Sequence, residues 1–561
     1  MFIAGAVSAA QNETWHGGPD FQGNYSNAAN WSPRNVPDNN SSTTYDVTIP
    51  APPPGNDFHG PTVDQNATID NLTLINRSAL NAAAGISFTV LGTTTQSTTS
   101  GHAGEYAVIN VGVGSTYKLG TLTNYDNSAH TLTGGYAVGF AGATDPATTL
   151  QFHGANVVTN NAFIFLAGSN ANIVDQDTGL DGFRNVAVNN GTLQFVDGHN
   201  FSTAGDFTNN VELNIGGLGP NSTIFTVTGS LTNYDSATHT LTGGIYLLDG
   251  TSGSARLKFT GADIHTLNAN VELMGAAAIT DENGNDAFRN LSANSGSLTV
   301  SNTRTITPAG GTLGNSGSVS VNGAGQVTVS GNYQQSNGTT QVGNNTGTAT
   351  MQVNGTSTIS GGKIDLGGGL GPGGFQPVFG STGGLNLGGS VVLDGTGTIN
   401  ADVVNSGHIA PGFSPGHITV NGALSLQNSS VLQMEIGGIS AGTQFDQLVQ
   451  HGDSSHLLTL GGTLQVSLIN GFENSISSGD TFRIVTSDHV LQGAFINVAN
   501  GARLVTSDGS GSFLVTYGNG SATPDAVKLS DFQPVPEPAT STLLCGAALL
   551  FCFLSLRRRA A

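Results

Sequence analysis

Short alternating runs of hydrophobic and polar residues fill most of this chain, and they predict β-strands. In residues 223–228, for example, the sequence TIFTVT places every second side chain on the same face of an extended backbone. Glycine, asparagine and aspartate separate such runs, at spacings too short for a crossover helix. Helical periodicity is nearly absent before residue 539. The pattern therefore predicts an almost purely β protein with tight turns.

A long internal duplication organises the first half of the chain. The block LTNYDNSAHTLTGG at residues 122–135 recurs as LTNYDSATHTLTGG at residues 231–244, which is 109 residues later. Two further blocks, starting at residues 150 and 182, recur 107 and 105 residues later. Three blocks in one order indicate a duplicated unit with small deletions.

Parallel strands that have no helices between them require a solenoid, in which each coil feeds the next through tight corners. Asparagine and glycine at the corners accept a left-handed backbone, and stacked asparagine side chains can form hydrogen bonds along the axis. We therefore expect an all-β fold of β-solenoid (parallel β-helix-like) repeats, followed by a C-terminal β region and a single C-terminal transmembrane helix. An array of antiparallel sandwiches is the main alternative.

The last 28 residues, PVPEPATSTLLCGAALLFCFLSLRRRAA, have three parts. These are Val535, Pro536, Glu537 and Pro538, then an uncharged apolar run over residues 539–556, and finally Arg557, Arg558 and Arg559. A helix of that length spans about 27 Å, close to the thickness of a hydrocarbon core. The arginines are expected to stay on the cytoplasmic side, which leaves residues 1–535 on the outer side.

This tail resembles the PEP-CTERM sorting signal of exopolysaccharide-producing Gram-negative bacteria. The resemblance implies recognition by exosortase, a membrane cysteine protease that cuts near the VPEP motif and releases or transfers the upstream part. Such tails also occur on some ice-binding proteins. A plain membrane anchor is the alternative interpretation, but it leaves the VPEP motif unexplained.

The first residues, MFIAGAVSAAQ, resemble the end of a secretory signal that lacks its basic start, so we expect the true start codon upstream. Trp15 and Trp31 are the chain's two tryptophans. We expect them to cap the open end of the repeat stack, with stacking on a sugar as the alternative.

Residues 301–430 resemble autotransporter-associated repeats, and residues 390–530 resemble the C-terminal segment found beside such repeats.

These observations predict the domain boundaries. They are 1–10 for a remnant of the secretory signal, 11–60 for an N-terminal capping segment, 61–335 for the duplicated β-repeat region (units of about 118–228 and 229–334), 336–430 for a glycine-rich β-solenoid, 431–530 for a C-terminal β region, and 531–561 for the sorting signal with its transmembrane helix at 539–556.

Charge and cysteine content narrow the set of partners. The chain has 36 Asp and Glu against 15 Lys and Arg, for a formal net charge of −21. An acidic chain repels phosphate backbones, so we expect no nucleic-acid partner. Both cysteines, Cys545 and Cys552, lie in the apolar tail, so the exported part has neither a disulfide nor thiol chemistry.

No motif indicates catalysis. GxSxG occurs around Ser414 and Ser440, but Pro415 lacks the N–H that an oxyanion hole needs, and both sequences lie in a β context. The 13 histidines show no metal-binding spacing. We therefore expect a protein that is not an enzyme. A polysaccharide-active β-helix enzyme is the first alternative, and an ice-binding protein with rows of Thr-x-Thr pairs is the second.

Acidic residues gather in two corresponding loops of the duplicated region. They are Asp175, Asp177 and Asp181 in the first loop, and Asp281 and Asp286 in the second. Clustered carboxylates in a glycine-containing loop suit Ca²⁺, which takes six to eight oxygen ligands. Neither loop has the EF-hand spacing, and acidic turn residues that face water are the alternative interpretation. No other cofactor is expected.

Together these features predict an exported structural or adhesive protein. We expect its tail to hold it in the inner membrane until exosortase delivers it to the cell envelope or the extracellular matrix. There it would contact cell-surface polysaccharide through many weak hydrogen bonds.

Overall fold

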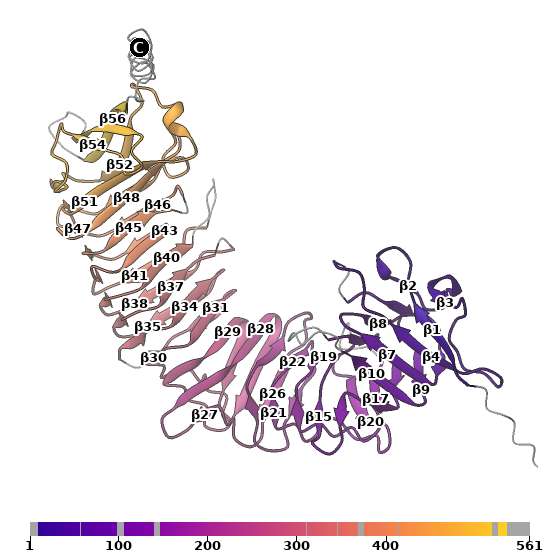
Figure 1. Ribbon diagram of the computed structural model, residues 1–561. Coiled ribbons are helices and arrows are strands. Elements are labelled where there is room, and N and C mark those ends of the chain that lie inside the picture. The colour runs from indigo at the N-terminus through magenta and orange to yellow at the C-terminus, as the bar shows by residue number, and fades with distance from the viewer. Residues whose placement is uncertain are drawn as a thin grey trace, which may run out of the picture. The chain divides into compact units, whose positions relative to one another are not determined.

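The computed structural model describes residues 9–55, 58–97, 106–139, 146–309, 311–344, 346–367, 375–412, 414–518 and 525–535. It is nearly all β, with 52% of residues in strands. The described residues contain no α-helix and three short 3-10 turns, which are η1 (Pro19–Phe21), η2 (Ala28–Asn30) and η3 (Phe472–Asn474). The predicted all-β class is therefore confirmed, and the long sheets of parallel strands are consistent with a β-helix-like fold (Figure 1).

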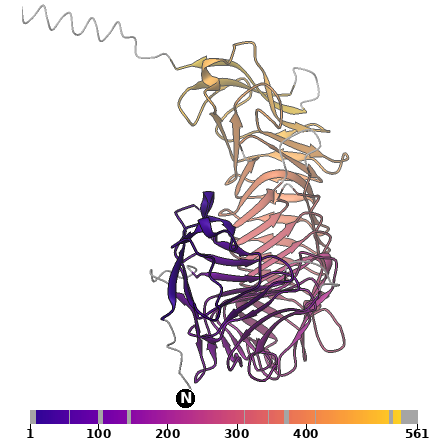
Figure 2. The same cartoon turned by 90° about the vertical axis from the view of Figure 1, so that its right-hand side faces the viewer.

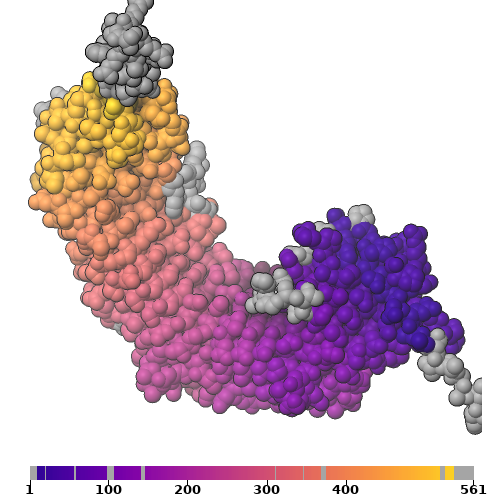
Figure 3. Space-filling model, viewed as in Figure 1, coloured from indigo at the N-terminus to yellow at the C-terminus, as the bar shows by residue number. Residues whose placement is uncertain are grey.

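The chain divides into two compact units. The first comprises Met1–Tyr333 and Thr346–Gln352, and the second comprises Gln334–Asn345 and Val353–Ala561. In the space-filling view the colour changes gradually across each unit, so segments that are close in the sequence lie side by side (Figure 3).

A long parallel ladder forms one face of the first unit. Its strands are β8 (Ala79–Ala82), β11 (Val108–Val111), β16 (Gly135–Val138), β19 (Phe163–Ala167), β22 (Thr192–Val196), β25 (Glu212–Gly216), β28 (Thr240–Phe259), β29 (Thr266–Thr280), β31 (Ser297–Ser301) and β34 (Ser318–Asn322). The register stacks one buried apolar residue of each coil on the next, in the column Val138, Leu166, Phe195, Ile215, Leu248, Leu273, Val300 and Val321. Apolar burial thus repeats once per coil.

Shorter ladders form the other faces of the first unit. One contains β1 (Gln11–Trp15), β4 (Tyr45–Ile49), β7 (Asn71–Ile75), β10 (Thr93–Ser97) and β13 (Thr121–Leu122). Another contains β6 (Ala67–Ile69), β9 (Ser87–Val90), β12 (Thr116–Lys118), β17 (Thr148–Phe152) and β20 (Ala171–Asp175). A third contains β15 (Thr131–Leu132), β18 (Thr159–Asn160), β21 (Val188–Asn189) and β24 (Thr208–Asn209).

Aromatic rings fill the N-terminal end of the first unit. Trp15, Tyr25 and Trp31 are fully buried, and the ring centroids of Trp15 and Trp31 lie 5.0 Å apart in an edge-to-face arrangement. Their indole N–H groups donate to the carbonyl oxygens of Phe21 and Tyr25 at 3.1 and 2.8 Å. Because neither indole is exposed, neither can stack on a sugar, and the sugar-stacking alternative is wrong.

The second unit repeats the same parallel stacking (Figure 2). Its first ladder contains β37 (Thr339–Val342), β40 (Lys363–Gly367), β43 (Val392–Asn400), β45 (His408–Pro411), β48 (Val431–Ile436) and β51 (Thr463–Leu468). Its second contains β39 (Ser357–Ile359), β42 (Leu385–Leu387), β44 (Val403–Asn405), β47 (Leu424–Leu426), β50 (Leu458–Leu460) and β53 (Gln492–Gly493). Its third joins β41 (Val378–Ser381) and β43 to β46 (His417–Asn421), β49 (Gln447–His451) and β52 (Phe482–Ser487).

Antiparallel strands close the C-terminal end of the second unit. β52 pairs with β56 (Ala526–Pro534), which pairs with β55 (Gly511–Tyr517), and β55 pairs with β54 (Arg503–Val505). A change of strand direction at the end of a stack blocks the addition of a further coil. The parallel pairs elsewhere exclude the array of antiparallel sandwiches as the main architecture of the described residues.

The remaining strands are short. They are β2 (Gly23–Asn24), β3 (Trp31–Ser32), β5 (Pro61–Val63), β14 (Tyr125–Asp126), β23 (Phe201–Ser202), β26 (Thr223–Val227), β27 (Tyr234–Asp235), β30 (Ala293–Asn294), β32 (Thr305–Ile306), β33 (Leu313–Asn315), β35 (Gln326–Val329), β36 (Tyr333–Gln335) and β38 (Thr350–Val353).

Buried asparagines form hydrogen bonds from coil to coil, as the sequence predicts. Asn160 donates its side-chain N–H to Asn189 Oδ1 at 2.9 Å, and Asn189 donates to Asn209 Oδ1 at 2.8 Å. All three side chains are fully buried. A polar residue inside the stack is tolerated because its partners on neighbouring coils satisfy it.

Candidate functional site

A group of two histidines and one aspartate lies on the second copy of the duplicated sequence. The hairpin between β27 and β28 ends at His239, whose backbone adopts a φ of 53°. The Asp235 carboxylate holds this turn by accepting the Ala237 N–H at 2.8 Å. Asp263 and His265 follow on the next coil, and the N–H of His265 donates to the carbonyl oxygen of His239 at 2.9 Å. Two neighbouring coils therefore bring residues 26 positions apart into contact.

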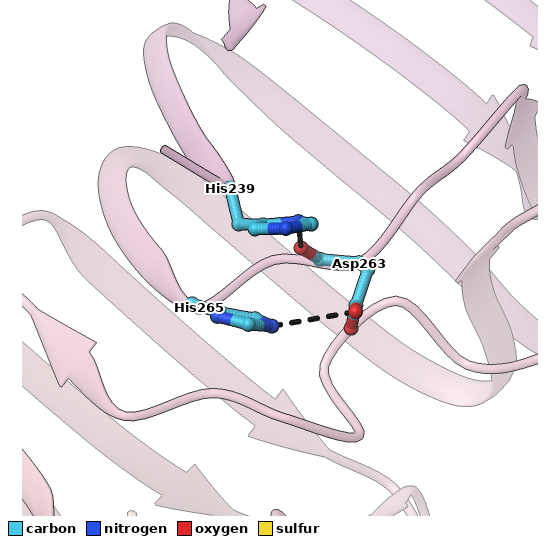
Figure 4. A group of neighbouring side chains, drawn as sticks. All are labelled: His239, Asp263 and His265. Atoms are coloured by element: carbon cyan, nitrogen blue, oxygen red, sulfur yellow. Dashed lines mark hydrogen bonds and ion pairs between the residues drawn. The ribbon is translucent and has the colours of Figure 1, made fainter. Parts of the chain in front are cut away.

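The three side chains meet on one side of these coils (Figure 4). Their nearest ring nitrogens and carboxylate oxygen all lie within 4.8 Å of one another. His265 Nε2 lies 3.3 Å from Asp263 Oδ2, and the rings of His239 and His265 stack with centroids 4.2 Å apart. The His265 and Asp263 side chains are 38% and 18% exposed, so solutes can reach the group.

Tyr234 fixes the position of His239. Its hydroxyl donates to the carbonyl oxygen of Asp263 at 2.9 Å and lies 3.0 Å from His239 Nδ1. His239 Nδ1 also lies 3.1 Å from that carbonyl oxygen. A carbonyl oxygen can only accept, so Nδ1 carries the ring proton and Nε2 keeps its lone pair. Burial raises the pKa of Tyr234, so its hydroxyl stays protonated and remains a donor.

Two neighbours orient the Asp263 carboxylate. Asn290 donates to Oδ1 at 3.0 Å and to Oδ2 at 3.2 Å, and the Arg289 guanidinium lies 3.4 Å from Oδ1. Arg289 is itself held by the carbonyl oxygens of Ala262 and Asp286, at 2.9 and 2.8 Å. The carboxylate is therefore fixed from one side while Oδ2 faces His265. Imidazole nitrogen and carboxylate oxygen are the donor set of many zinc sites.

The first copy of the duplication has the same framework with a different donor set. Tyr125 OH lies 2.9 Å from His130 Nδ1 and donates to the carbonyl oxygen of Asn156 at 2.9 Å. Asn185 donates to Asn156 Oδ1 at 2.8 Å, as Asn290 does to Asp263. The Val158 N–H donates to the His130 carbonyl oxygen at 2.9 Å. Asn156 and Val158 thus occupy the places of Asp263 and His265.

In the first acidic loop the structure brings two of the three predicted carboxylates together. Asp175 Oδ1 and Asp177 Oδ2 both accept the Gly154 N–H, at 2.9 and 3.1 Å, and Asp177 also pairs with His153 Nδ1 at 2.6 Å. Asp181 Oδ1 instead accepts the Phe183 N–H at 2.8 Å. Among the described residues, these carboxylates do not form a group of three.

In the second acidic loop each predicted carboxylate accepts hydrogen bonds from N–H groups of the same loop. Asp281 accepts the N–H groups of Asn283 and Asn285 at 2.9 and 2.8 Å, and Arg289 lies 3.8 Å away. Burial acts to raise the pKa of Asp281, but the hydrogen bond from the Asn285 side chain and those from the two N–H groups lower it below its usual value. Asp286 accepts the Phe288 N–H at 2.8 Å and pairs with Arg304.

Most of the predicted sorting signal lies outside the described residues. This holds for Pro536, Glu537, Pro538, the apolar run at 539–556, and Arg557, Arg558 and Arg559. Val535 is described: it is 54% exposed and its N–H donates to the Ser510 carbonyl oxygen at 3.0 Å. Among the helices of the described residues, none could span a membrane.

A polar groove of about 560 Å³ crosses coils of the second unit. Asn400, Asn421 and His451 lie in line across β43, β46 and β49, and Asn421 donates to Asn400 Oδ1 at 2.8 Å. The groove is also lined by Asp402 and by His456, whose pKa is raised by its contact with Asp453. Its walls therefore offer both donors and acceptors.

A smaller cavity of about 200 Å³ in the second unit gathers Asp394, Glu435 and Asp446. Burial raises the pKa of Asp446 to about 7, although its two oxygens accept the Gly416 and Glu435 N–H groups at 2.7 and 2.8 Å. Ser414, from the first GxSxG sequence, also lines this cavity, and its hydroxyl donates to Glu435. A nucleophilic serine is usually hydrogen-bonded to a histidine that takes its proton. The partner of Ser414 in this contact is a carboxylate, so the contact does not form a Ser-His pair.

Comparison with known proteins adds no family to this picture. No family model matches the sequence, and no curated protein matches it significantly.

Proposed function

We propose that this chain is an exported structural or adhesive protein, without enzymatic activity, that binds polysaccharide at the cell surface or in the extracellular matrix. The observation that carries the proposal is the polar groove on the second unit. Its Asn400, Asn421 and His451 side chains follow the stacking direction of the coils. Amide and imidazole groups in a row can form repeated hydrogen bonds to the hydroxyl groups of a chain-like ligand.

Repetition supports a role as a scaffold. A solenoid buries its core coil by coil and presents the same polar positions along its length. An exposed pair on the first unit, Asn161 and Asn190, makes the same type of contact at 3.1 Å from one coil to the next. Many weak polar contacts in line suit adhesion to a polymer better than capture of one small molecule.

In this proposal the tail delivers the protein. An apolar helix at 539–556 would hold it in the inner membrane of a Gram-negative bacterium, and exosortase would cut near the VPEP motif. The end of β56 at Pro534 supports this, because this last strand ends directly before the motif. A cut after this strand would leave all the described strands in the released part.

The tail is tested by expressing the full chain in a host with and without exosortase. A product that ends near residues 535–538, outside the inner membrane only when exosortase is present, supports the proposal. An intact membrane-bound chain in both hosts would reduce the tail to a plain anchor.

Polysaccharide binding is tested separately, by co-sedimentation of the full chain in detergent with purified exopolysaccharide. The variant N400A/N421A is expected to lose at least about half of the bound fraction, since it removes two amides from the groove. The matched control N161A/N190A removes an exposed cross-coil pair elsewhere. Equal binding by the wild type and both variants would reject the groove as the binding surface.

The cavity with Asp394, Glu435 and Asp446 supports a second candidate function, a polysaccharide-active enzyme. Glycoside hydrolases use two carboxyl groups, one of which has a raised pKa. Release of reducing ends from the same exopolysaccharide, lost in Glu435→Gln, would favour this function over a purely structural one.

Calcium in the acidic loops is a further part of the proposal. Asp175 and Asp177 share one N–H donor, and the Asp177 side chain is 53% exposed, so oxygen lone pairs stay accessible there. A fall in melting temperature on chelation with EGTA, absent in Asp177→Asn, would support a calcium site. The same melting temperature with and without EGTA would leave these residues as turn-forming acids.

A further inference from the structure

We propose that His239, Asp263 and His265 bind one divalent transition-metal ion, with Zn²⁺ as the reference ion. This inference concerns the first unit and does not depend on the proposed polysaccharide binding. Two imidazoles and one carboxylate are a donor set that zinc accepts, and an exposed fourth position would hold water. A calcium site would need more oxygen ligands than this group offers.

The distances fit such an ion. Two ligands about 2.05 Å from a tetrahedral zinc ion lie about 3.3 Å from each other. His265 Nε2 and Asp263 Oδ2 are 3.3 Å apart, and a ring nitrogen of His239 lies within 4.8 Å of a donor atom on each of the other two residues. The ring proton of His239 sits on Nδ1, so Nε2 offers its lone pair.

The supporting shell is that of a metal site. His239 Nδ1 is held at a backbone carbonyl oxygen, and the Asp263 carboxylate is oriented by Asn290 and Arg289. Metal-binding histidines commonly use their second nitrogen in this way, which fixes the ring orientation. The Arg289 guanidinium is close to Oδ1, and Oδ2 is the oxygen that faces the His265 ring.

One movement is required. The rings of His239 and His265 are nearly parallel, with an interplanar angle of 16°, so their in-plane lone pairs run side by side. The His265 ring must turn about its Cβ–Cγ bond to direct Nε2 toward the same ion as His239. Its side chain is 38% exposed, which leaves room for that rotation.

The duplication provides an internal control for this site. The first copy keeps Tyr125 and His130 in the same contacts but has Asn156 and Val158 in place of the aspartate and the second histidine. A single imidazole beside an amide is a poor zinc site. The two copies therefore differ in the donor set while they share the backbone framework.

The test uses the full chain in detergent, with Zn²⁺ binding at pH 7 measured by calorimetry and Co²⁺ binding by visible absorption. Wild type is expected to bind with a tetrahedral Co²⁺ spectrum. D263N/H265V, which gives the second copy the residues of the first, is expected to bind at least about 100-fold more weakly. Its circular dichroism should match that of the wild type, because those residues already occur in the same framework.

The reverse variant N156D/V158H tests the same inference through the gain of a second metal site. It builds the second donor set on the first copy, so the number of bound ions is expected to rise by one. Wild type without Zn²⁺ or Co²⁺ binding would overturn the proposal. So would equal affinity and stoichiometry in the wild type and D263N/H265V, because binding would then come from other histidines.

Discussion

The Asn189 side chain donates to Asn209 on the next coil at 2.8 Å while it accepts from Asn160 on the preceding one at 2.9 Å. It also donates to the Glu212 carbonyl oxygen at 2.8 Å, and it is fully buried. We therefore predict that Asn189→Ala lowers the free energy of unfolding by about 3 kcal/mol, because it leaves buried polar partners unsatisfied. Urea unfolding followed by circular dichroism measures this change.

The neighbouring residue Asn190 supplies the control for this ladder. It makes the same kind of contact, donating to Asn161 Oδ1 at 3.1 Å, but on the exposed side of the coil. Water can replace an exposed partner, so Asn190→Ala should cost less than about 0.5 kcal/mol. Equal losses at both positions would mean that burial does not determine the strength of the ladder.

The aromatic end of the first unit leads to a second prediction. Trp31 is fully buried, packs edge-to-face on Trp15 and Tyr25, and donates its indole N–H to the Tyr25 carbonyl oxygen. Trp31→Ala is expected to destabilise the first unit by about 3 to 5 kcal/mol, through the cavity that it leaves. Limited proteolysis should then cut first near the N-terminal coils, whereas Trp31→Phe should retain most of the protection.

Asp446 gives the second unit a pH dependence. Burial raises its pKa to about 7, whereas in the unfolded chain a carboxyl titrates near 4. The folded state therefore binds more protons between these two values, and its stability falls as the pH rises from about 4 to about 7. Ionisation of Asp446 lowers the free energy of unfolding by at most about 4 kcal/mol, since each pKa unit corresponds to about 1.4 kcal/mol.

Denaturation midpoints measured from pH 4.5 to 8 in the wild type and Asp446→Asn test this dependence. Burial lowers the pKa of His199 and of His417, and these two shifts make the stability rise with pH. Both proteins contain these histidines, so their contribution is the same in the two curves. The difference between the two curves isolates Asp446. A wild-type curve parallel to that of the variant over this range would contradict the prediction.

Much of the fold could be predicted from the sequence because it repeats a local pattern. Alternating runs such as residues 223–228 indicate strands, and the absence of helical segments between them favours parallel coils. The axial hydrogen bonds of Asn160, Asn189 and Asn209 follow from the same reasoning. The antiparallel closure by β54, β55 and β56 was not predicted, because alternation gives no strand direction.

The histidine site could not be predicted from spacing, since His239 and His265 are 26 residues apart and follow no metal-binding motif. Only the coil length places them in contact. A signal was nevertheless present in the duplicated blocks: Asn156 and Val158 in one copy align with Asp263 and His265 in the other. Comparison of the copies position by position would have identified the change in donor set.

Arg289 connects this site to the acidic loop and leads to the last prediction. Its guanidinium donates to two carbonyl oxygens, of Ala262 and Asp286, and lies 3.4 Å from Asp263. Arg289→Met keeps the length of the side chain but leaves both carbonyl oxygens without this donor. We expect the free energy of unfolding of the first unit to fall by about 2 kcal/mol, since hydrogen bonds to charged groups contribute more than neutral ones.

Arg184→Met is the matched variant in the first copy, where the guanidinium donates to the carbonyl oxygens of Ala155 and Asp181. Similar losses of stability in both variants, with weakened Zn²⁺ binding in Arg289→Met alone, would separate the structural role that the two copies share from the orientation of Asp263.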